Sequence, residues 1–192
     1  MSELTDMSTI KSFTVGMANS PDIMAARAIA DVFGTEHHEY IFTPEEAFSI
    51  LPKVVEHLET YEPELIRSSI PNYFLAKLAG SHTKVVLTGE GSDELFAGYL
   101  YWRDAPDKEA LHKETLRIFD HLASVNLQRS DRMGMAHGLE ARVPFLDVDM
   151  LRELYAEVRP RADGRVHGTS DSHRAPSHAR SQVDPQWKMH ET

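Results

Sequence analysis

A short apolar run that ends abruptly in a turn rich in glycine and acidic residues constrains the fold of this chain more than any other feature. Val85–Leu87 is rich in β-branched residues, and the turn Thr88–Glu94 reads TGEGSDE. Runs of this kind are typical of strands that are buried on both faces of a parallel sheet. Ligands bind beyond the carboxyl ends of such strands, so this turn is the first candidate for a binding site.

The residue types in this turn favour a nucleotide or phosphate ligand. Gly89 and Gly91 allow positive φ angles and let main-chain N–H groups approach a bulky ligand closely. Asp93 is a candidate ligand for Mg²⁺, which proteins usually hold together with substrate phosphates and waters. Glu90 is a candidate for acting on the reacting group. The alternative is an ordinary strand-to-helix turn, with Ser92 or Asp93 capping the helix.

Short apolar runs alternate with helical patterns along the chain, which favours an α/β fold with parallel strands. Two helix starts are well marked, because Ser20 and Thr43 are each followed by a proline and then by acidic residues. The pattern predicts strands at 12–16, 38–42 and 84–88, and helices that begin at 20 and 43 and that span 66–78, 111–123 and 147–157. The predicted order, βαβα at the start, is that of a layered α/β domain.

A second motif brings out a family resemblance. Residues 127–147 read LQRSDRMGMAHGLEARVPFLD, and residues 12–16 read SFTVG. With the turn at 88–94, in this order and spacing, the chain resembles the synthetase domain of the glutamine-hydrolysing asparagine synthetase family over roughly residues 12 to 157. The resemblance implies an α/β ATP-pyrophosphatase fold, similar to that of the adenine nucleotide alpha hydrolases.

The resemblance also implies a reaction and a set of roles. In the family, aspartate attacks the α-phosphate of ATP to give β-aspartyl-AMP and pyrophosphate, and ammonia then displaces AMP. By position, Val15 resembles the residue that contacts adenine, and Thr88 and Gly89 resemble the pair that holds the adenylate. Glu90 resembles the carboxylate associated with forming the aspartyl-adenylate, and Asp93 resembles a ligand of Mg²⁺-pyrophosphate.

Two arginines of the second motif are candidate anion contacts. A guanidinium binds phosphate or carboxylate groups bidentately, which would suit Arg132 and Arg142 for pyrophosphate or the substrate carboxylate. The alternative for both is pairing with acidic residues at the surface or at an interface. The expected ligands are therefore ATP, Mg²⁺, aspartate and ammonia.

The sequence departs from the family pattern in three places. No pyrophosphate loop of the Ser-Gly-Gly-Leu-Asp-Ser type occurs in Met1–Lys11, and the chain contains no cysteine, which excludes the cysteine-dependent glutaminase step for this polypeptide alone. After about Val158 the apolar periodicity ends. We therefore expect a truncated form with a partial synthetase domain at 1–158, incomplete at its N-terminal side, and an unrelated, disordered tail at 159–192.

Charge and composition restrict the expected binding partners and cellular location of the chain. The formal net charge of −10 argues against a nucleic-acid partner, because an acidic chain is repelled by phosphate backbones. No apolar run is long enough to span a bilayer, and residues 1–10 carry no signal-peptide pattern, so we expect no membrane role and a cytoplasmic location.

Two other interpretations stay open beside a truncated asparagine-synthetase-type ligase. One is a sister amide-forming synthetase of the same fold, distinguished by which acid stimulates pyrophosphate release. The other is an inactive fragment or interaction module of the family, which the missing loop and cysteine favour for the isolated chain. Loss of a strand would expose hydrogen-bonding backbone, which predicts aggregation or association with another chain such as a full-length synthetase.

Overall fold

The computed structural model describes residues 10–158, which divide after Asp147 into two compact units. All described elements but one belong to the first unit. The exception is α7 (Val148–Val158), which confirms the helix predicted at 147–157. The sequence-based predictions for Met1–Thr9 and for a disordered tail at 159–192 lie outside the described residues.

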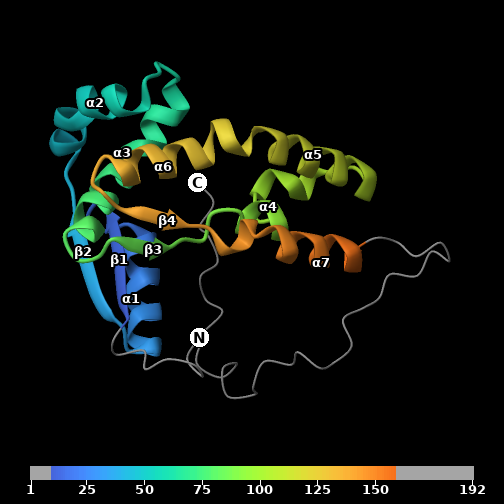
Figure 1. Ribbon diagram of the computed structural model, residues 1–192, viewed down its shortest axis with the longest axis horizontal. Helices are drawn as coiled ribbons and strands as arrows, with labels where there is room; N and C mark the ends of the chain where they lie inside the picture. Colours follow the sequence, from blue (N-terminus) through green and yellow to red (C-terminus); the bar gives the residue numbers. More distant parts are fainter. Residues whose placement is uncertain (1–9, 159–192) are drawn as a thin grey trace. The chain divides into compact units, whose positions relative to one another are not determined.

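The first unit alternates strands and helices, as the sequence predicts (Figure 1). In chain order, with η for a 3₁₀ helix, its elements are β1 (Lys11–Gly16), α1 (Pro21–Phe33), β2 (Glu36–Ile41), α2 (Pro44–Leu58), α3 (Pro63–Gly80), β3 (Val85–Leu87), α4 (Ser92–Phe96), η2 (Leu100–Asp104), α5 (Lys108–His121), η3 (Leu122–Ser124), α6 (Asn126–Met135), β4 (Glu140–Arg142) and η4 (Pro144–Leu146). The fold is α/β, mostly helical with small parallel sheets.

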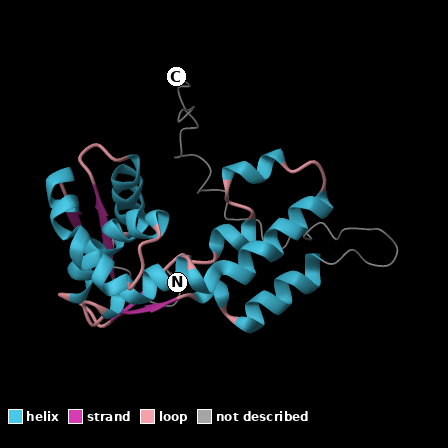
Figure 2. Ribbon diagram, turned by 90° about the horizontal axis from the view of Figure 1, so that it is seen from above, coloured by secondary structure: helices cyan, strands magenta, loops and turns pink. Residues whose placement is uncertain are grey.

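The four strands described in residues 10–147 form two separate parallel pairs (Figure 2). In the first pair, β1 runs beside β2 in a register that joins Lys11 to Glu36 and Gly16 to Ile41. In the second pair, β3 runs beside β4, with Val85 opposite Glu140 and Leu87 opposite Arg142. Each strand of the described region therefore has one strand partner and one remaining edge.

The helix starts predicted at Ser20 and Thr43 are confirmed at the level of hydrogen bonds. The Ser20 hydroxyl accepts from the Asp22 N–H at 3.3 Å. The Thr43 hydroxyl accepts from the Glu46 N–H at 3.2 Å, while the Glu46 carboxylate accepts from the Thr43 N–H at 2.8 Å. This reciprocal pair is a capping box, and Pro44 occupies the first helical turn, where a missing N–H costs nothing.

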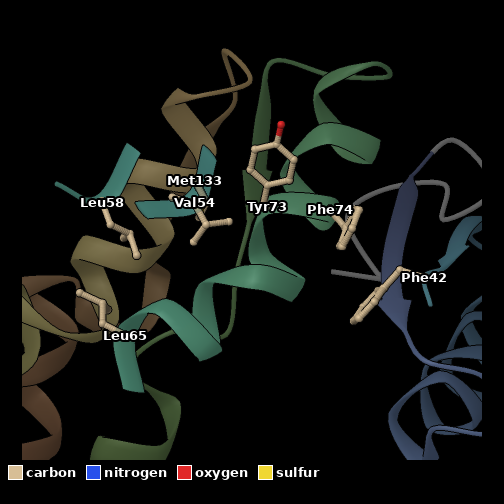
Figure 3. Packing of buried hydrophobic residues seen from close by; sticks show 7 residues of the cluster. All are labelled: Phe42, Val54, Leu58, Leu65, Tyr73, Phe74 and Met133. Carbon is tan, nitrogen blue, oxygen red and sulfur yellow. The ribbon is translucent and has the colours of Figure 1, made fainter. Parts of the chain in front are cut away.

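The main core of the first unit forms where α3 meets α2 and α6. Its seven buried residues, drawn as sticks in Figure 3, are Phe42, Val54, Leu58, Leu65, Tyr73, Phe74 and Met133. Val15 of β1 and three isoleucines pack against this cluster from partly buried positions. Burial of this apolar surface fixes α6, and with it the site residues that α6 carries.

Aromatic contacts fix the direction of α3 against the first strand pair. Phe74 stacks on Phe42, just beyond the end of β2, with ring centroids 4.8 Å apart. His82 follows the end of α3 and packs on His38 inside β2, with centroids 3.9 Å apart. The helix therefore runs antiparallel to β1 and β2. Only a short turn, residues 81–84, separates α3 from β3.

A tight reverse turn joins α6 to β4, and two glycines make room for it. A Cβ atom at Gly80 would lie 2.8 Å from the carbonyl oxygen of His137. A Cβ atom at Gly134 would lie 2.8 Å from the carbonyl oxygen of Leu139. Main-chain oxygens cannot swing away as side chains do, so both positions require the absence of a side chain.

The expectation that Val85–Leu87 is buried on both faces is wrong. Val86 packs against the small cluster of Ala76, Ala79 and Leu139, but Val85 is 39% exposed and Leu87 is 57% exposed. Side chains alternate between the two faces of a strand, and within the described region only the Val86 face is covered by a helix. The strand exists as predicted, yet its second apolar face is open.

Candidate active site

A large cavity lies beside β3 and extends to the turn beyond its carboxyl end. Its volume is about 1190 Å³, and its walls include the turn after β3, part of α6 and the first half of β1. Four of the predicted site residues line it together, namely Thr88, Gly89, Glu90 and Asp93. The candidate site therefore lies where ligands bind in parallel sheets, beyond the end of a strand.

Backbone conformation and a main-chain hydrogen bond determine the shape of the turn after β3. Gly91 has a φ of 93°, a left-handed conformation that suits glycine, and it precedes the first residue of α4. The Ser92 N–H bonds back to the carbonyl oxygen of Gly89 at 3.0 Å. A side chain at Gly91 would also overlap Leu146. This compact turn directs Glu90 and Asp93 toward the same cavity.

Glu90 is held by two donors from α6. Its Oε1 atom accepts from Arg129 Nη2 at 3.0 Å and from the Ser130 hydroxyl at 2.7 Å. The side chains of Glu90 and Arg129 are only 17% and 20% exposed, so this ion pair is shielded more than a surface pair. Both bonds found within residues 10–158 use Oε1, which leaves Oε2 available to accept a proton or a hydrogen bond from a ligand.

Glu94 lies four residues further along the chain. Its side chain is buried and has different hydrogen-bond partners. Its Oε1 atom accepts from the Tyr99 hydroxyl at 2.6 Å and from Asn126 Nδ2 at 2.8 Å. Burial, and then the hydrogen bond to Glu94, raise the pKa of Tyr99 to about 12. Glu94 is 2% exposed, and these two partners are neutral. This cluster satisfies a buried carboxylate and ties α4 to α6.

Asp93 fits a Mg²⁺ site that is shared with substrate phosphates. It is exposed at the cavity wall, and a side-chain carbon at Gly98 would overlap its carboxylate, so the absence of a side chain there leaves the carboxylate its room. The described residues contain no group of three or more histidines or acids that could hold a metal ion by themselves. A single carboxylate suits Mg²⁺, which keeps several waters and takes oxygens from phosphates.

The other three predicted site residues do not line the cavity. Val15 is partly buried against the main core. Arg132 bonds to Glu59 at 3.0 Å and Arg142 bonds to Glu140 at 2.8 Å, both with exposed side chains. The two arginines thus make the surface pairs that the sequence left open as the alternative.

Sequence reasoning missed four residues that line the cavity, namely Glu94, Asn126, Arg129 and Ser130. Arg129 and Ser130 belong to the second motif, in which Arg132 and Arg142 were preferred by residue type alone. Helical spacing does not choose between Arg129 and Arg132, because residues three apart on α6 lie on neighbouring parts of its surface. Nothing in the sequence connects Asn126 to Glu94, which is 32 positions away.

The unit is α/β, and acidic side chains gather beyond the end of one of its parallel strands. This arrangement is typical of the broad class of domains that bind ligands at strand ends. Comparison with known proteins makes this specific. The family model of asparagine synthase matches residues 1–110 and 103–165. The chain belongs to the asparagine synthase family.

Curated relatives agree with this assignment. A probable glutamine-hydrolysing asparagine synthetase of Schizosaccharomyces pombe is 43% identical over 171 residues, covering 88% of this chain and 30% of the relative. A probable enzyme of the same name from Dictyostelium discoideum is 48% identical over 139 residues, covering 72% of this chain and 25% of the relative. Asparagine synthetase 1 of Saccharomyces cerevisiae is 43% identical over 145 residues, covering 75% and 25%.

The chain thus spans about a quarter to a third of the length of these relatives. The similarity identifies the family. A search of the helices in residues 10–158 for one long and apolar enough to cross a membrane found none.

Proposed function

We propose that this chain carries the adenylate-forming part of an asparagine-synthetase-type site, with aspartate, ATP and ammonia as substrates. One observation supports this most strongly. Glu90, which the resemblance associates with the aspartyl-adenylate, lies in the cavity and is oriented by Arg129 and Ser130. A carboxylate fixed through one oxygen, with its second oxygen free for a ligand, is suited to accept a proton at a defined place.

The proposed reaction has two displacements. In the first, a carboxylate oxygen of aspartate forms a bond to the α-phosphorus of ATP, and the bond to the bridging oxygen breaks to release pyrophosphate. In the second, the nitrogen of ammonia forms a bond to the activated carbonyl carbon, and the bond to the phosphate oxygen breaks to release AMP. The nitrogen must lose a proton, and Glu90 Oε2 is the acceptor that we assign to it.

The remaining residues position the substrates. Thr88 and Gly89 line the cavity just beyond the strand end, where main-chain groups can hold the adenylate. Asp93 would hold Mg²⁺, which supplies charge neutralisation on the phosphate oxygens when bound. Val15 stays a prediction from the resemblance, and Arg132 and Arg142 stay predictions from residue type. Arg129 adds a cation in the cavity wall.

Pyrophosphate release by the purified chain tests the proposal. The assay contains ATP, Mg²⁺ and ammonia, with and without aspartate, and calorimetry measures ATP binding in parallel. We expect aspartate-dependent release that is lost in Glu90→Gln and in Asp93→Asn. The matched control is Glu109→Gln, which neutralises an exposed carboxylate on α5 that pairs with Lys113.

Each outcome bears on the proposal. Release that persists in both site variants would exclude the assigned roles. Release stimulated by another amino acid rather than by aspartate would point to the sister amide-forming synthetases. A folded chain with neither ATP binding nor release would leave the inactive fragment as the better interpretation.

A further inference from the structure

The chain folds back on itself immediately after α4. This helix has five residues and is followed by Ala97, which adopts a left-handed conformation with φ 54° and ψ 46°. Alanine is uncommon in this conformation because its Cβ atom is crowded there. The N–H groups of Ala97 and Gly98 both donate to the main-chain oxygen of Asp93. The turn therefore brings Gly98 directly against the first turn of α4, where Asp93 lies.

Aromatic residues anchor the segment that follows this turn. The Tyr99 hydroxyl donates to the buried carboxylate of Glu94 at 2.6 Å. The rings of Tyr99 and Trp102 are in edge contact, with centroids 5.4 Å apart, and Trp102 is buried. Gly98 is thus held from both sides, by the main chain of Asp93 before it and by Tyr99 after it.

Gly98 has no room for a side chain, and Asp93 is the reason. The three atoms nearest to the position of a Cβ atom at Gly98 all belong to Asp93. They are a carboxylate oxygen, which the Cβ atom would overlap, Cγ at 3.1 Å and Cα at 3.2 Å. The described glycines with positive φ are those at 34, 91 and 138, so the backbone at 98 would accept alanine. The obstacle is the side chain of Asp93.

One carboxylate oxygen of Asp93 therefore lies against the main chain of Gly98, and the other oxygen is the one left for a ligand. We propose that Gly98 is a positioning residue for the metal-binding carboxylate of Asp93. This inference rests on the proposed role of Asp93 at Mg²⁺. A single carboxylate oxygen suits this ion, which demands near-octahedral geometry and keeps several waters.

A methyl group at Gly98 would force the Asp93 carboxylate into another orientation. A binding site needs its ligating groups held within about 0.5 Å of the productive geometry. Loss of the groups that orient a metal ligand typically weakens metal binding about 10–100-fold. The smallest side chain at Gly98 should therefore weaken metal binding although the carboxylate itself is still present.

Binding of Mn²⁺ to the full chain, with ATP and without aspartate, tests this without turnover. Mn²⁺ accepts the same kinds of oxygen ligand as Mg²⁺. Its effect on water-proton relaxation distinguishes the ion bound to protein from the ion bound to free ATP. We expect Gly98→Ala to weaken binding about tenfold or more, as Asp93→Ala should. In the Asp93→Ala background, Gly98→Ala should have no further effect.

Gly34→Ala is the matched control. Gly34 follows α1 with φ 67°, and no group beyond its chain neighbours lies within 4 Å of its Cβ position. The substitution therefore strains the backbone at a residue that does not line the cavity. We expect a lower urea midpoint with unchanged Mn²⁺ affinity. This control separates lost positioning from lost stability.

A double-mutant cycle on stability tests the contact itself, without any metal. Gly98→Ala should lower the urea midpoint by about 0.5–1 M, because overpacking is destabilising. The same substitution should lower the midpoint less in Asp93→Ala, since the carboxylate that it overlaps is gone. Should Gly98→Ala fail to fold, recovery of folding in the double variant supports the inference, and no recovery overturns it.

Two results would overturn the inference alone. One is wild-type Mn²⁺ affinity in Gly98→Ala while Asp93→Ala binds weakly. The other is an equal loss of stability from Gly98→Ala in both backgrounds. Equal Mn²⁺ binding by the wild-type chain and Asp93→Ala would instead remove Asp93 from the proposed function, and the positioning role of Gly98 with it.

Discussion

Two acidic side chains four residues apart, Glu90 in the turn after β3 and Glu94 on α4, have opposite surroundings. Glu90 is partly exposed to the cavity and pairs with the cation of Arg129. Glu94 is buried and accepts from the neutral groups of Tyr99 and Asn126. The difference separates two uses of a carboxylate, because the first retains an oxygen for a ligand while the second is committed to the fold.

Neutralising Glu90 should give the largest change in rate. In Glu90→Gln we expect the proposed aspartate-dependent pyrophosphate release to fall about 100-fold or more, the usual scale for a lost general base. The free energy of unfolding should change by only about 1–2 kcal/mol, since Ser130 still has an acceptor. Steady-state rates and urea unfolding of one preparation measure both quantities. A stable variant with normal release would remove Glu90 from the chemistry.

Removing Glu94 should give the largest change in stability. Glu94→Ala leaves the Tyr99 hydroxyl and the Asn126 amide without their buried acceptor, so we expect a loss of about 2–3 kcal/mol. Glu94→Gln keeps an acceptor oxygen and is the matched control, with a smaller loss. Urea unfolding followed by circular dichroism measures both. Equal stability of wild type and Glu94→Ala would contradict the structural role.

The two arginines of α6 should differ in their effect on the site. Arg129→Met removes the cation beside Glu90, and we expect pyrophosphate release to fall about tenfold because a shielded, charge-assisted hydrogen bond is lost. Arg132→Met removes an exposed pair with Glu59 and should have a smaller effect, since such pairs contribute about 0–1 kcal/mol. The same rate assay compares them. A larger effect at Arg132 would favour the anion-binding role predicted from its residue type.

The smallest expected effect is a dependence of stability on alkaline pH. Burial raises the pKa of Tyr99 from about 10 to about 12, so its phenol stays protonated in the folded chain over a range in which it ionises in the unfolded chain. Its contribution is complete below pH 10 and is lost as the pH rises toward 12. We expect Tyr99→Phe to flatten this part of the stability profile. Urea midpoints between pH 9 and 12 measure it, and parallel profiles would contradict the prediction.

The parts of the fold governed by local sequence were predictable. Ser20 and Thr43 mark helix starts because capping depends on residues two or three positions away. The strand Val85–Leu87 was predictable from its composition, although its exposed face was not. Whether a second layer covers a strand depends on elements elsewhere in the chain, and no local pattern records it.

The candidate site was predictable in part for the same reason. Glu90 and Asp93 follow the strand directly, so their place beyond its end can be derived from the order of residues. The partners of Glu90 come from α6, which is 39 and 40 positions away. The choice between Arg129 and Arg132 depends on the rotation of α6 about its axis. The burial of Met133 in the main core fixes that rotation. The rotation can therefore be read from the packed structure but not from the sequence.

The reverse turn after α6, enclosed by Gly80 and Gly134, has a consequence for how this sequence tolerates change. Each glycine lies against a main-chain oxygen, so even the single methyl group of alanine would have to displace backbone. In a library of all single substitutions selected for correct folding, these two positions should be among the most depleted, although neither carries a functional group. Substitutions at these two glycines would then disturb folding of the domain as strongly as substitution of any acidic residue in the cavity disturbs its function.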